Sequence, residues 1–321
     1  MDITKRNHYN PCFWTALWNS TYYEKSIAGV TSGELARKQV VHVLNAKSQK
    51  IYPATVERVH YDKNLGIAEI TRLAAEDFVR RYYPDRYEQF ISESTIASYP
   101  IYLDFENILS GIEATPAYQT LLKVATTQTV DNLIEKCYLA SFVVLQNLRS
   151  HSMMNAMIEW HQEIGRAKFE HLLTFKWMLS DPDFLFRLIY PLMTSQWNLY
   201  TSCSHRLPLC DSPILVQPAS VMVALSPLLL LEIRTDLPAP ESMMPTSRKI
   251  NSSTLEEYRL RTVGNTFREI IGEPKQLETW RASTEFQRRS EIMNDIKQYN
   301  TMIQATGDQE LWHLNAYANR R

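Results

Sequence analysis

The chain has 321 residues, of which 45% are hydrophobic and 21% are charged, and its 34 lysines and arginines nearly balance 35 aspartates and glutamates. The 7 tryptophans, 17 tyrosines and 11 phenylalanines require a buried core, which excludes a collagen-like, low-complexity or mostly disordered chain. A formal net charge of −1 without a long run of one sign removes the usual basic signature of a nucleic-acid-binding protein.

In the first quarter of the chain, the expected elements are a β-hairpin and two helices. The valine-rich segment 39–44 and the alternating segment 51–60 flank a polar turn, which predicts a hairpin. Apolar residues three to four positions apart predict a helix over 65–82 that Pro84 ends, followed by a short helix over 85–92.

The middle of the chain is predicted to be helical. Pro100 and Pro116 each lie at the first turn of an expected helix. From 129 to about 170, apolar stripes indicate one bent helix or two consecutive helices. Asp181 is the expected N-cap of another helix, which ends near 192.

The apolar period then changes to that of β-structure. The aliphatic runs 209–216 and 221–233 are broken by Pro218 and Pro227, which predicts short strands that turn at the prolines. The three prolines in 237–247 indicate a loop.

Helices are expected again at the end of the chain. A capping box at Ser253 and Glu256 opens a helix that runs through Ile271 and ends at Gly272, and a final helix covers 275–303.

Together these elements predict a mostly helical α+β fold in a single domain, 1–321. The helical middle, 65–204, is inserted between two β segments, 1–64 and 205–236, and C-terminal helices follow over 250–321. Because isolated hairpins are marginal in water, the two β segments are expected to share one small mixed sheet.

The cysteines and the longest apolar stretch bear on the compartment. The four cysteines are Cys12, Cys137, Cys203 and Cys210. Their spacing does not match a zinc site, and the polar first ten residues do not match a secretory signal. The apolar stretch 219–231 is shorter than the roughly 20 residues of a membrane helix. We therefore expect free thiols, no membrane span and a cytoplasmic location.

The opening stretch 7–14 combines an imidazole, a proline and aromatic residues where the start of a chain is usually polar. His8 titrates near neutral pH and Pro11 restricts the backbone, so this segment is a candidate to hold an imidazole against a cleft, with Tyr9 beside it. The alternative is structural: His8 and Tyr9 hydrogen-bond the chain start to the body, while Trp14 and its neighbours fill the core.

Two further candidates come from the helical middle and from the second β segment. Gln146 and Arg149 share one helix face, so an amide and a guanidinium are placed to bind a carboxylate or a phosphate. Asp211 interrupts an apolar run and needs a cation or a polar network if it is buried, with Ser212 next to it. The structural alternatives are a buried salt bridge for Arg149, with Asp211 as one partner, and an Asx turn for Asp211.

These residues carry a resemblance. The chain resembles the uncharacterised microbial family known as domain of unknown function 4238 over nearly its whole length, through four motifs in the same order: His8-Tyr9-x-Pro11-x-Phe13, Gln146-x-x-Arg149, Asp211-x-Pro213 and Ser226-Pro227. It departs from the family at Cys210, where the family has serine, and at His151, where the family commonly has proline. The family has no established activity, so the resemblance implies shared residues without implying a reaction.

We expect His8, Arg149 and Asp211 to converge on a cleft between the sheet and the helices. In an enzyme, this cleft would hydrolyse a phosphoester or a nucleotide: His8 would be the general base or acid, Asp211 would orient it or hold a divalent metal, and Arg149 would bind the anionic group. The substrate-binding residues would be Tyr9, Gln146 and Ser212.

Two alternatives stay open. In the first, the chain is a non-catalytic binding or interaction module, the same residues form a structural network, and the ligand is a small molecule, a nucleotide or a protein partner. In the second, which rests on the resemblance, the chain is an accessory or toxin-like component of a bacterial defence system.

Overall fold

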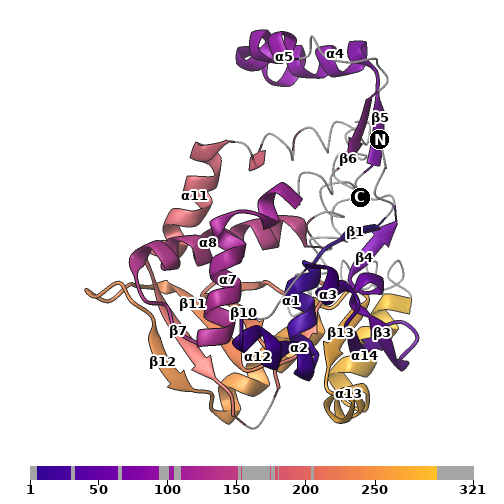
Figure 1. Ribbon diagram of the computed structural model, residues 1–321, viewed down its shortest axis with the longest axis vertical. Helices are drawn as coiled ribbons and strands as arrows, with labels where there is room; N and C mark the ends of the chain where they lie inside the picture. Colours follow the sequence, from indigo (N-terminus) through magenta and orange to yellow (C-terminus); the bar gives the residue numbers. More distant parts are fainter. Residues whose placement is uncertain are drawn as a thin grey trace, which may run out of the picture.

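The computed structural model describes residues 6–29, 33–63, 67–93, 101–104, 110–150, 181–203 and 206–294, with Met153, Thr174, Met178 and Leu179. These residues form the predicted mostly helical α+β fold (Figure 1). The continuations of the predicted helices over 105–109, beyond 150 and beyond 294 lie outside them.

The N-terminal hairpin belongs to a four-stranded antiparallel sheet. Its strand order is β3 (Ile51–Thr55), β2 (Val40–Asn45), β13 (Glu269–Gly272) and β8 (Leu209–Cys210). The early hairpin and the segment that begins at 209 therefore share a sheet, as predicted, but β13 lies between them. β13 corrects the prediction that the helix from 253 continues through Ile271, because Ile270 pairs with Leu44 on one side and Cys210 on the other.

The remaining later strands form a second sheet, which corrects the expectation of one shared mixed sheet. Its strand order is β12 (Thr246–Lys249), β7 (Ser195–Thr201), β11 (Leu229–Pro238), β10 (Ser220–Ser226) and β9 (Leu215–Gln217). The predicted turns at Pro218 and Pro227 separate β9, β10 and β11. β7 lies in the segment predicted as helical, and β12, which begins inside the predicted loop 237–247, pairs with β7 in parallel.

The helices cover the two sheets. The helices that surround the four-stranded and five-stranded sheets are α1 (Cys12–Thr15), α2 (Ser20–Ile27), α3 (Gly33–Arg37), α7 (Pro116–Thr127), α8 (Leu133–Arg149), α11 (Pro182–Met193), α12 (Ser252–Asn265), α13 (Pro274–Arg281) and α14 (Thr284–Asn294). Pro116 begins α7, and Asp181 caps α11 by accepting hydrogen bonds from the backbone N–H groups of Asp183 and Phe184, both as predicted. The predicted final helix is divided into α13 and α14.

A second correction concerns the segment that lies apart from the sheets in Figure 1. β5 (Ile67–Ile70) pairs with β6 (Ile101–Asp104), although both were predicted as helix. Apolar residues three positions apart are compatible with a helix and also with the two ends of a short strand. Pairing with a strand more than 30 residues away stabilises the extended conformation here. The predicted helices follow as α4 (Arg72–Tyr82), capped by Thr71, and α5 (Tyr87–Glu93).

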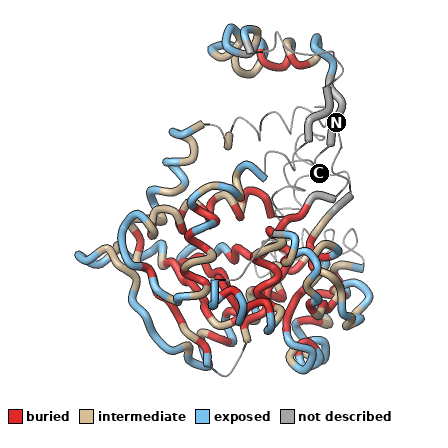
Figure 2. The backbone as a smooth tube through the Cα atoms, viewed as in Figure 1, coloured by how far each residue is buried: buried red, intermediate tan, exposed pale blue. Residues whose placement is uncertain are grey.

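The core joins both sheets with the start of the chain. Trp14 is fully buried and donates a hydrogen bond from Nε1 to the Leu225 carbonyl at 3.0 Å, and Trp18 donates to the Leu207 carbonyl at 2.6 Å. The expectation that these aromatic residues fill the core is confirmed. Figure 2 shows the buried backbone concentrated in the sheets and in α8. Among the described residues, no helix combines the length and the apolar character needed to cross a bilayer.

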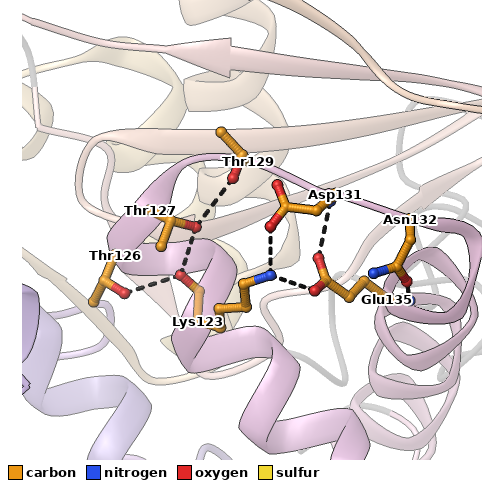
Figure 3. Close-up of polar contacts among 7 residues, drawn as sticks. All are labelled: Lys123, Thr126, Thr127, Thr129, Asp131, Asn132 and Glu135. Atoms are coloured by element: carbon orange, nitrogen blue, oxygen red, sulfur yellow. Dashed lines mark hydrogen bonds and ion pairs between the residues drawn. The ribbon is translucent and has the colours of Figure 1, made fainter.

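The turn between α7 and α8 fixes the helix that carries Gln146 and Arg149 (Figure 3). Lys123 on α7 reaches across to Asp131 at 2.6 Å and to Glu135 in the first turn of α8. Asn132 caps α8 by accepting a hydrogen bond from the Glu135 N–H at 2.9 Å. These contacts lie at the end of α8 opposite to Arg149, so both ends of this helix are held.

The first residue of α12 differs from the prediction by two positions. Asn251 is the N-cap, and its Oδ1 accepts a hydrogen bond from the Thr254 N–H at 2.8 Å. The predicted cap, Ser253, lies inside the helix.

This difference is testable with two alanine variants. Asn251→Ala leaves the Thr254 N–H without its partner, so we expect a loss of about 1 kcal/mol in the free energy of unfolding. Ser253→Ala is the matched control and should change the unfolding free energy by less than about 0.5 kcal/mol. Urea denaturation checks both values, and a larger loss for Ser253→Ala would contradict the Asn251 cap.

Candidate functional site

The segment from His8 to Asn10 lies between α8 and the four-stranded sheet. Arg149 Nη2 donates a hydrogen bond to the His8 carbonyl at 2.8 Å, and Gln146 Nε2 donates to the Tyr9 carbonyl at 2.8 Å. On the other side, Asn10 Nδ2 donates to the carbonyl of Cys210 at 2.9 Å. The three predicted segments therefore meet in space, and the contacts that join them are largely made to main-chain atoms.

Among the described residues, the imidazole of His8 forms no hydrogen bond with Arg149 or Asp211. β1 (Arg6–His8) pairs with β4 (Tyr61–Lys63), and His8 Nε2 donates a hydrogen bond to the Glu57 carbonyl at 3.3 Å. Burial lowers the pKa of His8 to about 4, and the nearby positive charge of Arg149 acts in the same direction against the Glu57 hydrogen bond. His8 is therefore neutral at pH 7.

Arg149 is 1% exposed and is paired with a carboxylate other than the expected one. Its Nη1 donates to Glu113 Oε1 at 2.7 Å, and no ion pair with Asp211 occurs among the described residues. Burial acts to lower the pKa of Arg149, but the interactions with Tyr118 and Glu113 outweigh it and raise the pKa above its ordinary value. The guanidinium is permanently charged and held in place.

Asp211 uses both carboxylate oxygens on the main chain that leads into β13. Its Oδ1 accepts from the Phe267 N–H at 2.9 Å, and its Oδ2 accepts from the N–H groups of Arg268 at 2.5 Å and Glu269 at 3.2 Å. The adjacent Ser212 is buried, and its carbonyl accepts from Asn265 Nδ2 and from Cys210 Sγ. In this arrangement Asp211 anchors the strand entry instead of orienting His8.

The same contacts bear on the expected divalent metal. Within the described ranges, no group of three or more His, Cys, Asp or Glu side chains is placed to hold a metal ion. Asp211, the expected ligand, already has an N–H donor on each oxygen. These residues do not fit a divalent metal at this position.

A small pocket of about 40 Å³ lies beside Tyr9 and Asp211. The other residues that line it are Arg58, His60, Tyr61, Arg268 and Glu269. Both carboxylates of this lining accept hydrogen bonds from the protein. Asp211 accepts from three backbone N–H groups, and Glu269 accepts from the His60 backbone N–H at 3.0 Å and the Tyr52 hydroxyl at 3.0 Å. The side chains of this lining that carry N–H or O–H donors are two guanidiniums, an imidazole and two phenols.

His60 is the residue of this pocket that sequence reasoning missed. It is 2% exposed and has φ of +51°, a left-handed conformation that is uncommon outside glycine and is often found at functional sites. Asn10 Nδ2 donates to its Nδ1 at 2.8 Å. Because Asn10 also donates from Nδ2 to a carbonyl, the amide orientation is unambiguous, and the neutral ring of His60 carries its proton on Nε2. Only the neighbouring strands reveal this conformation, so the sequence offered no signal for it.

No model of a known protein family, no curated protein and no solved structure matches this chain.

The anchoring role of Asp211 is testable through its amide analogue. In Asp211→Asn the new NH₂ group faces a backbone N–H, so we expect the unfolding free energy to fall by about 3 kcal/mol. Urea denaturation measures the loss. Asp236→Asn, which changes a surface carboxylate paired with Arg234, should leave the midpoint unchanged. A fully stable Asp211→Asn protein would argue that the three amide contacts contribute little.

The buried neutral His8 predicts acid sensitivity. Its pKa is about 4 in the folded chain against 6.5 for an exposed histidine, so between these values the unfolded chain binds more protons. Stability is complete above pH 6.5 and falls by about 3 kcal/mol as the pH drops to 4. Unfolding free energies of the wild type and of His8→Gln, measured at pH 7, 5.5 and 4.5, should show a shallower pH dependence for the variant. Equal slopes would contradict a buried neutral His8.

Proposed function

We propose that this chain is a binding module whose pocket at His60 takes a small anionic group such as the phosphate of a phosphoester. The observation that carries the proposal is the lining: Arg58 and Arg268 flank an imidazole whose proton is on Nε2. Guanidinium groups match the oxygens of a phosphate through two parallel hydrogen bonds. The carboxylates of Asp211 and Glu269, which also line the pocket, accept hydrogen bonds from N–H and O–H donors of the protein.

The size of the pocket limits the ligand. A volume of about 40 Å³ accepts one small polyatomic group and leaves the remainder of a larger ligand at the surface. Recognition of the anionic group alone, without a buried base or sugar, is what this volume supports.

What supports binding over hydrolysis is the use of the expected catalytic side chains. Arg149 is bound to Glu113 and to the His8 carbonyl, and Asp211 is bound to three amides. A general base needs an unprotonated nitrogen within reach of the attacking group. His8 is buried, donates its Nε2–H to a carbonyl and is not among the residues that line the pocket, so the network is better explained as the frame of the pocket.

We further propose a reducing compartment, which agrees with the expected cytoplasmic location. Its support is that none of the four cysteines forms a disulfide in the described chain. We also propose that the chain belongs to the family that its motifs resemble. The support for this membership is that His8, Gln146, Arg149 and Asp211, distant in sequence, lie in one region of the fold.

Inorganic phosphate is the simplest probe of the pocket. At a concentration of about 100 times the dissociation constant, phosphate should raise the unfolding free energy of the full chain by about 2.7 kcal/mol. Arg58→Ala removes one guanidinium from the rim and should weaken phosphate binding about tenfold. Titration calorimetry measures the affinity directly, at ionic strength matched with sodium chloride.

The matched control is Arg234→Ala, because Arg234 is another partly exposed arginine but pairs with Asp236 far along the chain from the pocket. Its phosphate affinity should equal that of the wild type. Absence of phosphate binding by the wild type, or an equal loss in both variants, would reject a phosphate site at His60.

A further inference from the structure

Lys136 is a buried lysine on α8 that the proposed pocket does not use. Its exposed fraction is 0%, and it forms no ion pair within the described part of the chain. Its ammonium donates a hydrogen bond to the Met243 carbonyl at 2.9 Å and a longer one to the Ser195 carbonyl at 3.4 Å. Its Nζ also lies 5.2 Å from the centre of the Trp197 ring, a cation–π contact.

The Met243 carbonyl belongs to the segment 239–245, which we call the strap, between β11 and β12. Glu241 and Ser242 in the strap are exposed, as the pale blue loop between these strands shows in Figure 2. The backbone tie at its start is the hydrogen bond from the Ala239 N–H to the Thr194 carbonyl at 2.8 Å. Lys136 therefore connects the far side of the strap to the interior by a hydrogen bond, and Met244 in the strap also packs against the hydrophobic core.

The backbone of the strap is held in a costly conformation at this contact. Met243 has φ of +57°, in the left-handed region that an unbranched side chain adopts at a cost of about 1 kcal/mol or more. Its N–H is bonded to the Pro240 carbonyl at 2.7 Å, which closes a tight turn and directs the Met243 carbonyl to Lys136. Such a conformation persists only where the surroundings enforce it.

Two carbonyl acceptors and an aromatic face offset the desolvation cost of burying Lys136. Desolvation lowers its pKa to about 8, so the side chain is still mostly charged at neutral pH. A charged donor makes stronger hydrogen bonds than a neutral one, so Lys136 contributes a strong polar contact to the attachment of the strap.

We propose that the strap is a conformational gate that Lys136 holds closed from inside the protein through the Met243 carbonyl. Opening the gate detaches 239–245 from α8 and exposes the amine of Lys136 and the face of Trp197 to solvent. The rest of the five-stranded sheet stays paired, since β10 and β11 are joined by their own register of hydrogen bonds. The gate is independent of the phosphate pocket.

Acetylation of the lysines with N-hydroxysuccinimidyl acetate, followed by mass spectrometry, tests whether the strap covers Lys136. In the wild type, Lys136 should react at least tenfold more slowly than the exposed Lys38. Met243→Pro cannot adopt φ of +57°, so the strap should open and Lys136 should react at least tenfold faster than in the wild type. Met243→Gly is the matched control: it keeps the carbonyl, accepts the positive φ and should stay within threefold of the wild-type rate.

Hydrogen exchange tests the role of Lys136 itself. Lys136→Met keeps the length of the side chain without its charge, and we expect the amides of Glu241 to Met244 to exchange at least tenfold faster while those of 221–233 keep their protection. Lys38→Met removes an exposed lysine whose ion-pair partner in the described chain is Glu34, and it should leave the strap exchange unchanged.

Unchanged strap exchange in a folded Lys136→Met protein would overturn the gate. If Lys136→Met does not fold, the acetylation of Met243→Pro decides: equal Lys136 reactivity in this variant and the wild type would show that the strap does not cover the amine.

Discussion

A single buried arginine holds the start of this chain in its place. Arg149 is nearly inaccessible to water, so its charge must be compensated inside the protein, and Glu113 provides the carboxylate at 2.7 Å. The Nη2 of Arg149 donates to the His8 carbonyl, while Gln146, three residues earlier on α8, donates to the Tyr9 carbonyl. The buried carbonyls at the end of β1 and just beyond it need such donors. The aromatic residues that follow depend on this anchor for their position in the core.

The same contacts of Arg149 and Gln146 with the N-terminal segment also fix the geometry of the pocket. Asn10 follows His8 and Tyr9. Its Oδ1 accepts a hydrogen bond from Gln146, and its Nδ2 donates to the Cys210 carbonyl and to His60 Nδ1. The contact with His60 Nδ1 selects the tautomer of the imidazole in the pocket. The backbone N–H of His60 in turn donates a hydrogen bond to Glu269 on β13. One hydrogen-bond chain thus runs from α8 through the N-terminal segment to the four-stranded sheet. Networks of this kind gain from full satisfaction and lose heavily when one member is removed.

The protein treats two buried cations of α8 in different ways. Arg149 is matched by a carboxylate and serves a rigid junction, whereas Lys136 has carbonyls and an aromatic ring as its partners in the described chain. A neutral set of partners leaves an ammonium more weakly compensated than an ion pair does, which is reflected in its lowered pKa. The same helix therefore supports a fixed connection at its C-terminal end and a releasable one near its N-terminal end.

Local chemistry made several features readable in advance: the hairpin of β2 and β3, the helices α8 and α11 with the Asp181 cap, and the turns at Pro218 and Pro227. Each depends on residues within a few positions of one another, where period, capping and proline geometry act. The residue types of the N-terminal network were also visible, but their partners were not. Asn10 donates a hydrogen bond to a carbonyl 200 positions away. β13 forms although its residues have a helical pattern, because it pairs with two strands that are distant in sequence. The positive φ of His60 is imposed by its neighbours in the fold. Side-chain direction and strand pairing follow from long-range packing, which no local pattern encodes.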